Sequence, residues 1–155
     1  MINPGAHGGY HDEHEKYGYI KDTEYGDTFI SQKMMDDGML YPNMNGQLVF
    51  KNAVTRFPEV IMEALTDANL TPDAIDLLVP HQANLRISQF VQKRMGLRDD
   101  QVWSNIQKYG NTTAASIPIA LTEAWEAGKV NSGDLVCLAA FGSGFTWASA
   151  LIRWI

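Results

Sequence analysis

The hydrophobic positions after residue 46 switch between helical and extended periods. Apolar side chains recur at three- and four-residue spacing from Phe50 to Leu70, which predicts an amphipathic helix that covers one face of a sheet. Pro58 lies inside this stretch, so we expect a kink or a break into two pieces there. A short apolar run over residues 76–79 follows. It predicts a buried strand that ends at Pro80.

The next stretch alternates between helical and extended patterns. A second helix is expected from near Asn84 to Gly96, because glycine is a favourable residue just past a helix end. Residues 102–106 predict a short extended piece. A third helix is expected over about 114–127, and its apolar positions predict four buried residues: Ile117, Leu121, Ala124 and Trp125.

Two apolar strands close the chain, over 134–141 and 145–154, joined by Gly142-Ser143-Gly144. So short a connection predicts an antiparallel hairpin. The first of the two is continuously apolar, which is typical of a strand buried on both faces. The order of elements predicts an α/β fold: a mixed sheet flanked by helices, with a C-terminal β-hairpin.

Residues 1–46 are rich in glycine and show no sustained helical period. We interpret them as a loop-rich segment of the same domain as 47–155, with short extended pieces over 17–21 and 28–30. An independent domain seldom opens with so much loop. We therefore expect a further segment upstream, or a larger protein against which these residues lie.

Composition restricts the functional classes. The chain has 155 residues and a formal net charge of -6, which disfavours nucleic acid as a partner. Its single cysteine, Cys137, excludes an internal disulfide and a zinc site built on several thiolates. No apolar run is long enough to span a membrane, and the amino terminus does not resemble a signal peptide. We expect a cytoplasmic protein.

Three histidines, His7, His11 and His14, surround two acidic residues and could form a metal site. Gly8 and Gly9 make a helix that would align His7 with His11 doubtful. A solvated polar loop is the favoured interpretation, and no metal site is predicted.

Polar groups follow the ends of three predicted elements: His81, Asn111 and the backbone of Gly142-Ser143-Gly144. A histidine taken alone is more often a helix cap or a filled polar notch in the core. A neutral imidazole and a carboxamide that donate to one carbonyl oxygen would instead stabilise an enolate, and glycine-rich N–H groups could hold a second oxyanion. Such groups suit carbon–carbon bond formation between thioesters. The nucleophile is missing, because Cys137 lies in an apolar strand that favours a core role.

Three segments carry a resemblance to a known family: Val79-Pro80-His81-Gln82-Ala83-Asn84, the run from Tyr109 to Pro118, and Phe141-Gly142-Ser143-Gly144-Phe145-Thr146-Trp147. They resemble the signature segments of the carboxyl-terminal half of β-ketoacyl-acyl-carrier-protein synthase III, from about Gly46 to Ile155. The resemblance implies a thiolase-like layered half-domain.

The resemblance also implies a reaction. An acyl group passes from acyl-CoA to an active-site cysteine, malonyl-acyl-carrier protein is decarboxylated, and the carbanion attacks the acyl thioester, at the start of fatty acid or polyketide synthesis. His81 and Asn111 would hold the malonyl thioester carbonyl, Phe141 would favour decarboxylation, and the N–H of Ser143 would form half of the oxyanion hole within Gly142 to Gly144. The thioesters are substrates, and no cofactor is implied.

The resemblance assigns Gln82, Asn84 and Arg86 to CoA or carrier-protein binding. Asn84 would lie near the pantetheine arm and Arg86 would dock the acidic carrier protein, although Arg86 is equally well explained as a solvated helix charge. The family has Gly-Gly-Gly where this chain has Gly-Ser-Gly. Ser143 can supply its N–H only if its backbone angles suit a residue with a Cβ.

The cysteine nucleophile of the family sits in the amino-terminal half, which the chain does not contain. We therefore expect the chain to be catalytically incomplete alone, with that half as a partner. We also expect a homodimer, because a lone half of a paired fold leaves apolar surface uncovered. The alternative is a non-catalytic thiolase-like module that binds CoA or a carrier protein.

Overall fold

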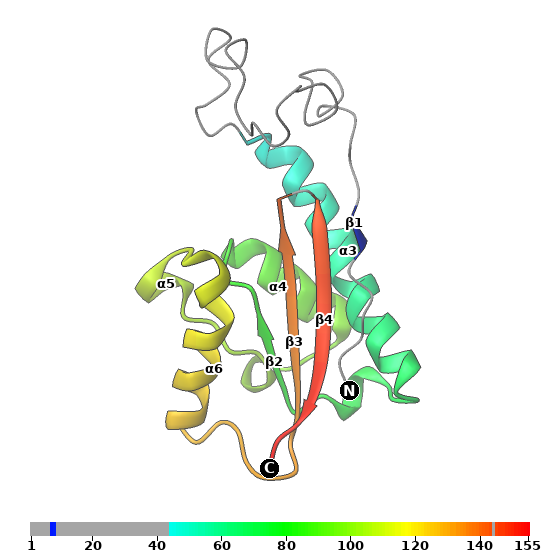
Figure 1. The fold of residues 1–155 in the computed structure, drawn as a ribbon, viewed down its shortest axis with the longest axis vertical. Helices are drawn as coiled ribbons and strands as arrows, with labels where there is room; N and C mark the ends of the chain where they lie inside the picture. Colours follow the sequence, from blue (N-terminus) through cyan, green and yellow to red (C-terminus); the bar gives the residue numbers. More distant parts are fainter. Residues whose placement is uncertain (1–6, 9–43, 144) are drawn as a thin grey trace, which may run out of the picture.

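A mixed four-stranded sheet forms the centre of the molecule (Figure 1). The computed structural model describes residues 7–8, 44–143 and 145–155. The strands are β1 (His7–Gly8), β2 (Leu77–Pro80), β3 (Leu135–Gly142) and β4 (Thr146–Arg153), in the order β1-β4-β3-β2.

The C-terminal hairpin is confirmed. β3 and β4 pair antiparallel from Leu135 with Arg153 to Gly142 with Thr146. β2 runs parallel to β3, with Pro80 opposite Ala139, while β1 pairs antiparallel with β4. β3 is therefore an inner strand, which explains its continuously apolar sequence.

The first long helix, α3 (Gly46–Asp67), begins earlier than the apolar pattern indicated. Asn45 caps it by accepting a hydrogen bond from the N–H of Leu48 at 3.1 Å. Of the kink or break expected at Pro58, the break is wrong, because α3 continues through it as one helix, and the kink stays a prediction. Pro58 is buried, so packing of this face offsets the loss of one backbone hydrogen bond.

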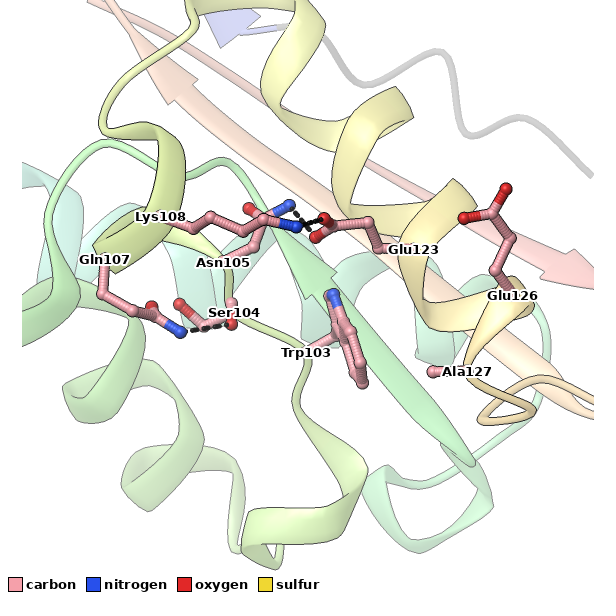
Figure 2. A pocket seen from close by; sticks show the side chains of 8 residues that line it. All are labelled: Trp103, Ser104, Asn105, Gln107, Lys108, Glu123, Glu126 and Ala127. Atoms are coloured by element: carbon pink, nitrogen blue, oxygen red, sulfur yellow. Dashed lines mark hydrogen bonds and ion pairs between the residues drawn. The ribbon is translucent and has the colours of Figure 1, made fainter.

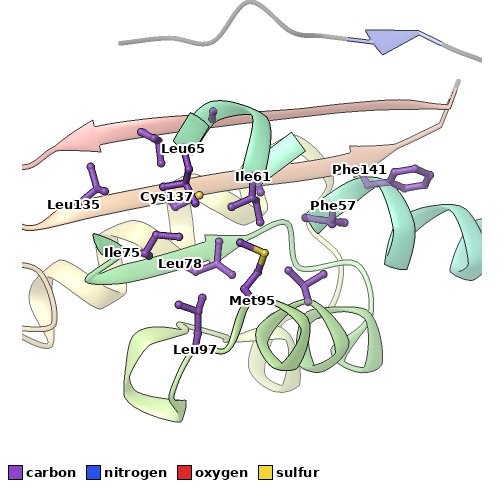
Figure 3. Packing of buried hydrophobic residues seen from close by; sticks show 14 of the residues in the cluster. Phe57, Ile61, Leu65, Ile75, Leu78, Met95, Leu97, Leu135, Cys137 and Phe141 are labelled. Atoms are coloured by element: carbon purple, nitrogen blue, oxygen red, sulfur yellow. The ribbon is translucent and has the colours of Figure 1, made fainter. Parts of the chain in front are cut away.

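The second helix, α4 (Leu85–Met95), is confirmed with both its ends. Asn84 caps its start and Gly96 ends it in the left-handed conformation, at φ 71°. α3 and α4 pack against the same face of the sheet (Figure 3), and their apolar residues form the larger of two hydrophobic clusters. Ile61, Leu65 and Leu78 lie at its centre, fully buried.

The third helix, α6 (Ser116–Glu126), covers the opposite face and completes a three-layer arrangement (Figure 1). Its small residues Ala120 and Ala124 pack in the second cluster. The expectation that Trp125 is buried is wrong, since 56% of it is exposed. The helix turns Ala124 toward the sheet, and the next residue is rotated by about 100° away from it. Ile117 and Leu121 are partly buried at the edge of that contact.

The extended piece expected over 102–106 is confirmed only at its start, where Val102 has extended backbone angles and the N–H of Trp103 donates to the carbonyl of Leu78 at 3.0 Å. Only Val102 makes a parallel bridge, with Leu78, and the chain then turns into the short helix α5 (Ile106–Tyr109). The backbone N–H of Asn105 is bonded to the Gln82 side chain instead of to a strand. Short 3-10 turns at Pro72–Ala74, Asp99–Gln101 and Thr113–Ala115 complete the connections.

Several predictions on the first 46 residues fall outside the described residues, among them the extended pieces over 17–21 and 28–30 and the group that includes His11 and His14. The proposed boundary between 1–46 and 47–155 stays a prediction. Among the helices that the structure describes, none is both long and apolar enough to cross a lipid bilayer.

Candidate active site

The carboxyl ends of β2 and β3 lie at the same edge of the sheet (Figure 1). The backbone N–H of His81 continues the ladder by donating to the carbonyl of Ala139 at 2.8 Å. Phe141 and Gly142 follow Ala139 at the end of β3. The fold therefore brings the first and third predicted segments together at the edge where open α/β sheets bind ligands.

His81 is half-buried, and its ring is held from one side. Burial lowers the pKa of the imidazole from its ordinary value of 6.5, so the ring is neutral at neutral pH. Its Nδ1 lies 2.5 Å from the hydroxyl oxygen of Ser116, the first residue of α6. A neutral imidazole held at Nδ1 leaves Nε2 for a substrate.

Asn111 is exposed in the loop before α6. Its Oδ1 accepts a hydrogen bond from the N–H of Thr113 at 2.8 Å, which leaves the side-chain NH₂ group to donate. Thr113 has φ 53°, a left-handed conformation that is unusual for a β-branched residue. The contact between Ser116 and His81 ties the end of this loop to the end of β2.

Phe141 is buried in an aromatic group at the end of β3. Its ring centroid lies 5.2 Å from that of Phe145, 6.2 Å from that of Trp147 and 6.4 Å from that of Phe57. Arg56 of α3 lies over the Trp147 ring, 5.2 Å from its centroid. These contacts place the Phe141 ring in a packed aromatic group at the sheet edge.

Gly142 is exposed at the end of β3 and Ser143 is exposed in the turn that follows, while Gly144 is outside the described residues. In the part of the chain that the structure describes, the non-glycine residues with positive φ are Asn69 and Thr113. Ser143 is not one of them, so its φ lies outside the left-handed region that favours glycine. Its carbonyl accepts a hydrogen bond from the Thr146 hydroxyl at 3.2 Å.

The three residues assigned to CoA or carrier-protein binding differ in position. Asn84 and Arg86 are exposed at the start of α4, where Oδ1 of Asn84 accepts from the N–H of Arg86. The Gln82 side chain instead points inside, with 1% of the residue exposed. Its amide donates to Pro80 O and accepts from Ser104 and Asn105. These contacts are those of a residue that positions the loops around it.

A polar network extends from Gln82 to α6. Asn105 donates from its backbone to Gln82 and from its side chain to Oε2 of Glu123, at 2.8 Å. Oε1 of Glu123 accepts from Lys108 and Tyr109, each at 2.6 Å, and these bonds lower the Glu123 pKa to about 2. Because Tyr109 precedes the Gly110-Asn111 turn, the network fixes the start of the Asn111 loop.

A pocket of about 500 Å³ opens beside this network, between the α5 segment and α6 (Figure 2). Figure 2 shows Lys108 and Asn105 directed toward Glu123, with Trp103 below them. None of the predicted site residues lines the pocket. It borders the support of the Asn111 loop and is separate from His81.

Cys137 is 0% exposed in the middle of β3, inside the larger cluster (Figure 3). Burial raises the pKa of its thiol to about 12. The prediction that Cys137 is a core residue agrees with this environment.

The sequence reasoning missed three residues that support the site: Ser116, Asn105 and Glu123. Serine near a helix start is usually a cap. Ser116 is instead already inside α6, with Ala115 at the cap position. Asn105 and Glu123 are 18 residues apart, and no short pattern links them.

Comparison with known proteins gives consistent matches. The model of the family "3-Oxoacyl-[acyl-carrier-protein (ACP)] synthase III C terminal" matches residues 65–154. The Beta-ketoacyl-[acyl-carrier-protein] synthase III of Campylobacter jejuni subsp. jejuni is 45% identical over an alignment of 132 residues that covers 83% of this chain and 41% of the relative.

Two solved structures extend the match. The 3-oxoacyl-[acyl-carrier-protein] synthase III of Aquifex aeolicus VF5 is 46% identical, with a TM-score of 0.73, over 76% of this chain and 38% of that one. The priming β-ketosynthase of a polyketide biosynthetic pathway is 32% identical, with a TM-score of 0.68, over 77% of this chain and 38% of that one. This chain thus spans about two fifths of the length of these relatives.

The expected thiolase-like α/β fold is confirmed by these structural matches. The family model covers more than half of the sequence and includes His81, Asn111 and the β3–β4 hairpin. The chain therefore belongs to the 3-oxoacyl-[acyl-carrier-protein] synthase III family, and its matching residues are the C-terminal region of that family.

Proposed function

We propose that this chain supplies the malonyl-binding side of a decarboxylating condensing enzyme, which joins an acyl-CoA-derived acyl group to malonyl-acyl-carrier protein. The observation that carries the proposal is the environment of His81. A half-buried ring with a lowered pKa, held at Nδ1, presents a neutral donor at the sheet edge beside Phe141. A neutral donor suits a thioester oxygen that gains negative charge.

In each step of this condensation, residues of this chain have a role. When the bond between C2 of the malonyl group and its carboxylate breaks, CO₂ leaves and the electron pair moves to the thioester oxygen as an enolate. His81 and the NH₂ group of Asn111 donate to that oxygen. The aromatic group around Phe141 lowers the local polarity, which disfavours the charged carboxylate and so assists its loss.

The enolate carbon then attacks the acyl thioester on a cysteine, and the tetrahedral intermediate expels the cysteine thiolate. The N–H of Ser143, with Gly142 and Gly144, would stabilise the second oxyanion. Cys137 does not fit the role of nucleophile, because it is fully buried with a raised pKa. We infer that an amino-terminal half provides the cysteine and that this chain alone does not turn over.

The exposed surface supports a proposal for partner binding. Arg86, at the start of α4, is available to an acidic carrier protein, and Asn84 to the pantetheine arm. Ile117, Leu121 and Trp125 recur every four residues along one side of α6. We propose that the amino-terminal half covers this side of α6. When that half is absent, a second copy of the chain covers the same side, which gives a homodimer.

Complementation tests the proposal. A cysteine-bearing amino-terminal half, prepared from the Aquifex relative, is mixed with this chain, acetyl-CoA and malonyl-acyl-carrier protein. The β-ketoacyl product should form in the mixture, and His81→Ala or Asn111→Ala should abolish it. Turnover by this chain without the added half would contradict the missing nucleophile.

The alternative function is a module that binds CoA or a carrier protein without chemistry. The exposed positions of Asn84 and Arg86 favour it equally. It predicts that the complemented mixture binds malonyl-acyl-carrier protein but releases no CO₂. Release of CO₂ that depends on His81 would exclude it.

A further inference from the structure

The hydroxyl of Ser116 lies between two groups at the end of β2. Its oxygen is 2.5 Å from Nδ1 of His81 and accepts a hydrogen bond from the backbone N–H of Gln82 at 3.3 Å. Ser116 is only 1% exposed. Solvent therefore has little access to this hydroxyl, and its single proton must serve one of the groups around it.

The direction of these bonds can be derived from the donors and acceptors. A backbone N–H can only donate, so the bond from Gln82 uses a lone pair of the Ser116 oxygen. The hydroxyl proton then remains to be donated. Nδ1 of a neutral imidazole can accept it, and Nε2 must then carry the ring proton.

The opposite arrangement leaves a group unsatisfied. If Nδ1 carried the proton and donated to Ser116, the oxygen would accept two bonds and its own proton would need a third partner. The described residues provide none for it besides His81 and Gln82. A buried hydroxyl proton without an acceptor is costly, so this tautomer of His81 is disfavoured.

We propose that Ser116 is a positioning residue that fixes His81 as the tautomer protonated at Nε2. Gln82 takes part through its backbone N–H, which orients the serine oxygen, and through its buried side chain, which anchors that backbone. This inference rests on the proposed function, because that function is the reason for His81 to need a proton on Nε2. A proton fixed at Nε2 is what a thioester oxygen at the sheet edge requires.

Nitrogen NMR on the full chain tests the tautomer without any substrate. The ¹⁵N shifts and two-bond couplings of an imidazole ring distinguish Nε2–H from Nδ1–H. His81→Gln assigns the signal, because it deletes one of the four histidine patterns. At a pH where the ring is neutral, the unaltered chain should show His81 with protonated Nε2 and a shielded, hydrogen-bonded Nδ1.

Ser116→Ala should change that signature. Without the hydroxyl, the Nδ1 resonance should lose its hydrogen-bond shift and the ring should move toward a mixture of tautomers. Ser149→Ala is the matched control. Ser149 is also a buried serine, and its hydroxyl donates to Val60 O at 2.7 Å, away from His81, so its loss should leave the pattern unchanged.

Ser116→Thr, which retains the hydroxyl, should restore the original pattern. A dominant Nδ1–H tautomer in the unaltered chain, or an identical pattern in Ser116→Ala, would overturn the inference. The complemented assay separates the two proposals. If His81→Ala has no effect on product while Ser116→Ala changes the tautomer, the proposed function fails and the positioning role stands.

Discussion

Gln82 accepts a hydrogen bond from the backbone N–H of Asn105 at 3.1 Å, inside the protein and 23 residues away along the chain. The same Gln82 oxygen accepts from Ser104, and its NH₂ group donates to Pro80 O at 2.7 Å. A single buried amide thus joins the end of β2 to the segment that leads into α5. Its bond to the N–H of Asn105 lies between the extended start of this piece at Val102 and the first residue of α5.

Gln82→Ala should destabilise the fold by about 2–4 kcal/mol, because it leaves several buried partners without their bonds. Chemical denaturation measures the change. Gln92→Ala is the control, since Gln92 on α4 also donates from its amide, at 2.7 Å to Asp99, but in an exposed pair. That variant should lose less than about 1 kcal/mol. Equal losses in both variants would show that the network adds nothing.

Glu123 should stabilise the fold, and this contribution should be lost in acid. Its hydrogen bonds from Lys108, Tyr109 and Asn105 lower its pKa from 4.5 to about 2 in the folded chain. A carboxyl whose pKa is lower in the folded chain than in the unfolded chain stabilises the fold at any pH above its pKa in the unfolded chain. This contribution is therefore full above pH 4.5 and disappears as the pH falls toward 2.

Thermal melts of Glu123→Gln across this range check the contribution. The variant should melt lower than the unaltered chain near neutral pH, and the difference should shrink as the pH falls from 4.5 toward 2. Glu126→Gln is the matched control, one turn along α6 in the same pocket (Figure 2). A difference for Glu123→Gln that does not depend on pH would rule out its charge as the cause.

His81 should titrate below its ordinary pKa of 6.5, because burial disfavours the imidazolium. The unfolded chain then binds more protons than the folded chain as the pH falls through 6.5, so His81 costs stability in that window. A proton NMR titration of the ring checks the direction. His81→Gln should remove the corresponding loss of stability, and a midpoint at or above 6.5 would contradict the burial argument.

Local signals in the sequence were sufficient for the elements that their own residues determine. α4 could be predicted with both ends because Asn84 and Gly96 are strong caps. The hairpin could be predicted because the Gly-Ser-Gly connection is too short for a crossover. In both cases the deciding residues are neighbours along the chain.

Three of the misses have a non-local cause. Residues 102–106 have an extended pattern, but only their start is extended, and a side chain 23 residues away binds the N–H of Asn105. A break at Pro58 is one of the two expected outcomes, but Pro58 is buried and α3 continues through it. Ser116 could not be found beside His81 because 35 residues separate them. Predicting such contacts requires the fold, which local periodicity does not provide.

Cys137 should be chemically silent in the folded chain. Its thiol is fully buried and its pKa is raised to about 12, so a thiol reagent should react only after unfolding. Ellman's reagent, added with and without denaturant, measures this directly. Cys137→Ala should cost about 1–2 kcal/mol of stability and leave complemented condensation intact. Rapid labelling of the folded chain, or lost condensation in a folded Cys137→Ala variant, would reopen its role as nucleophile.

Trp125 should be central to self-association, because its exposed ring continues the apolar side of α6 formed by Ile117 and Leu121. Sedimentation of the unaltered chain should show a dimer. Trp125→Glu should weaken it at least tenfold, since burying a charge in an apolar contact costs more than about 1.4 kcal/mol. Phe90→Glu on α4 is the control, because Phe90 is also an exposed aromatic residue but lies on the other side of the sheet. A monomeric unaltered chain, or equal weakening by both variants, would contradict the proposal that α6 forms the contact.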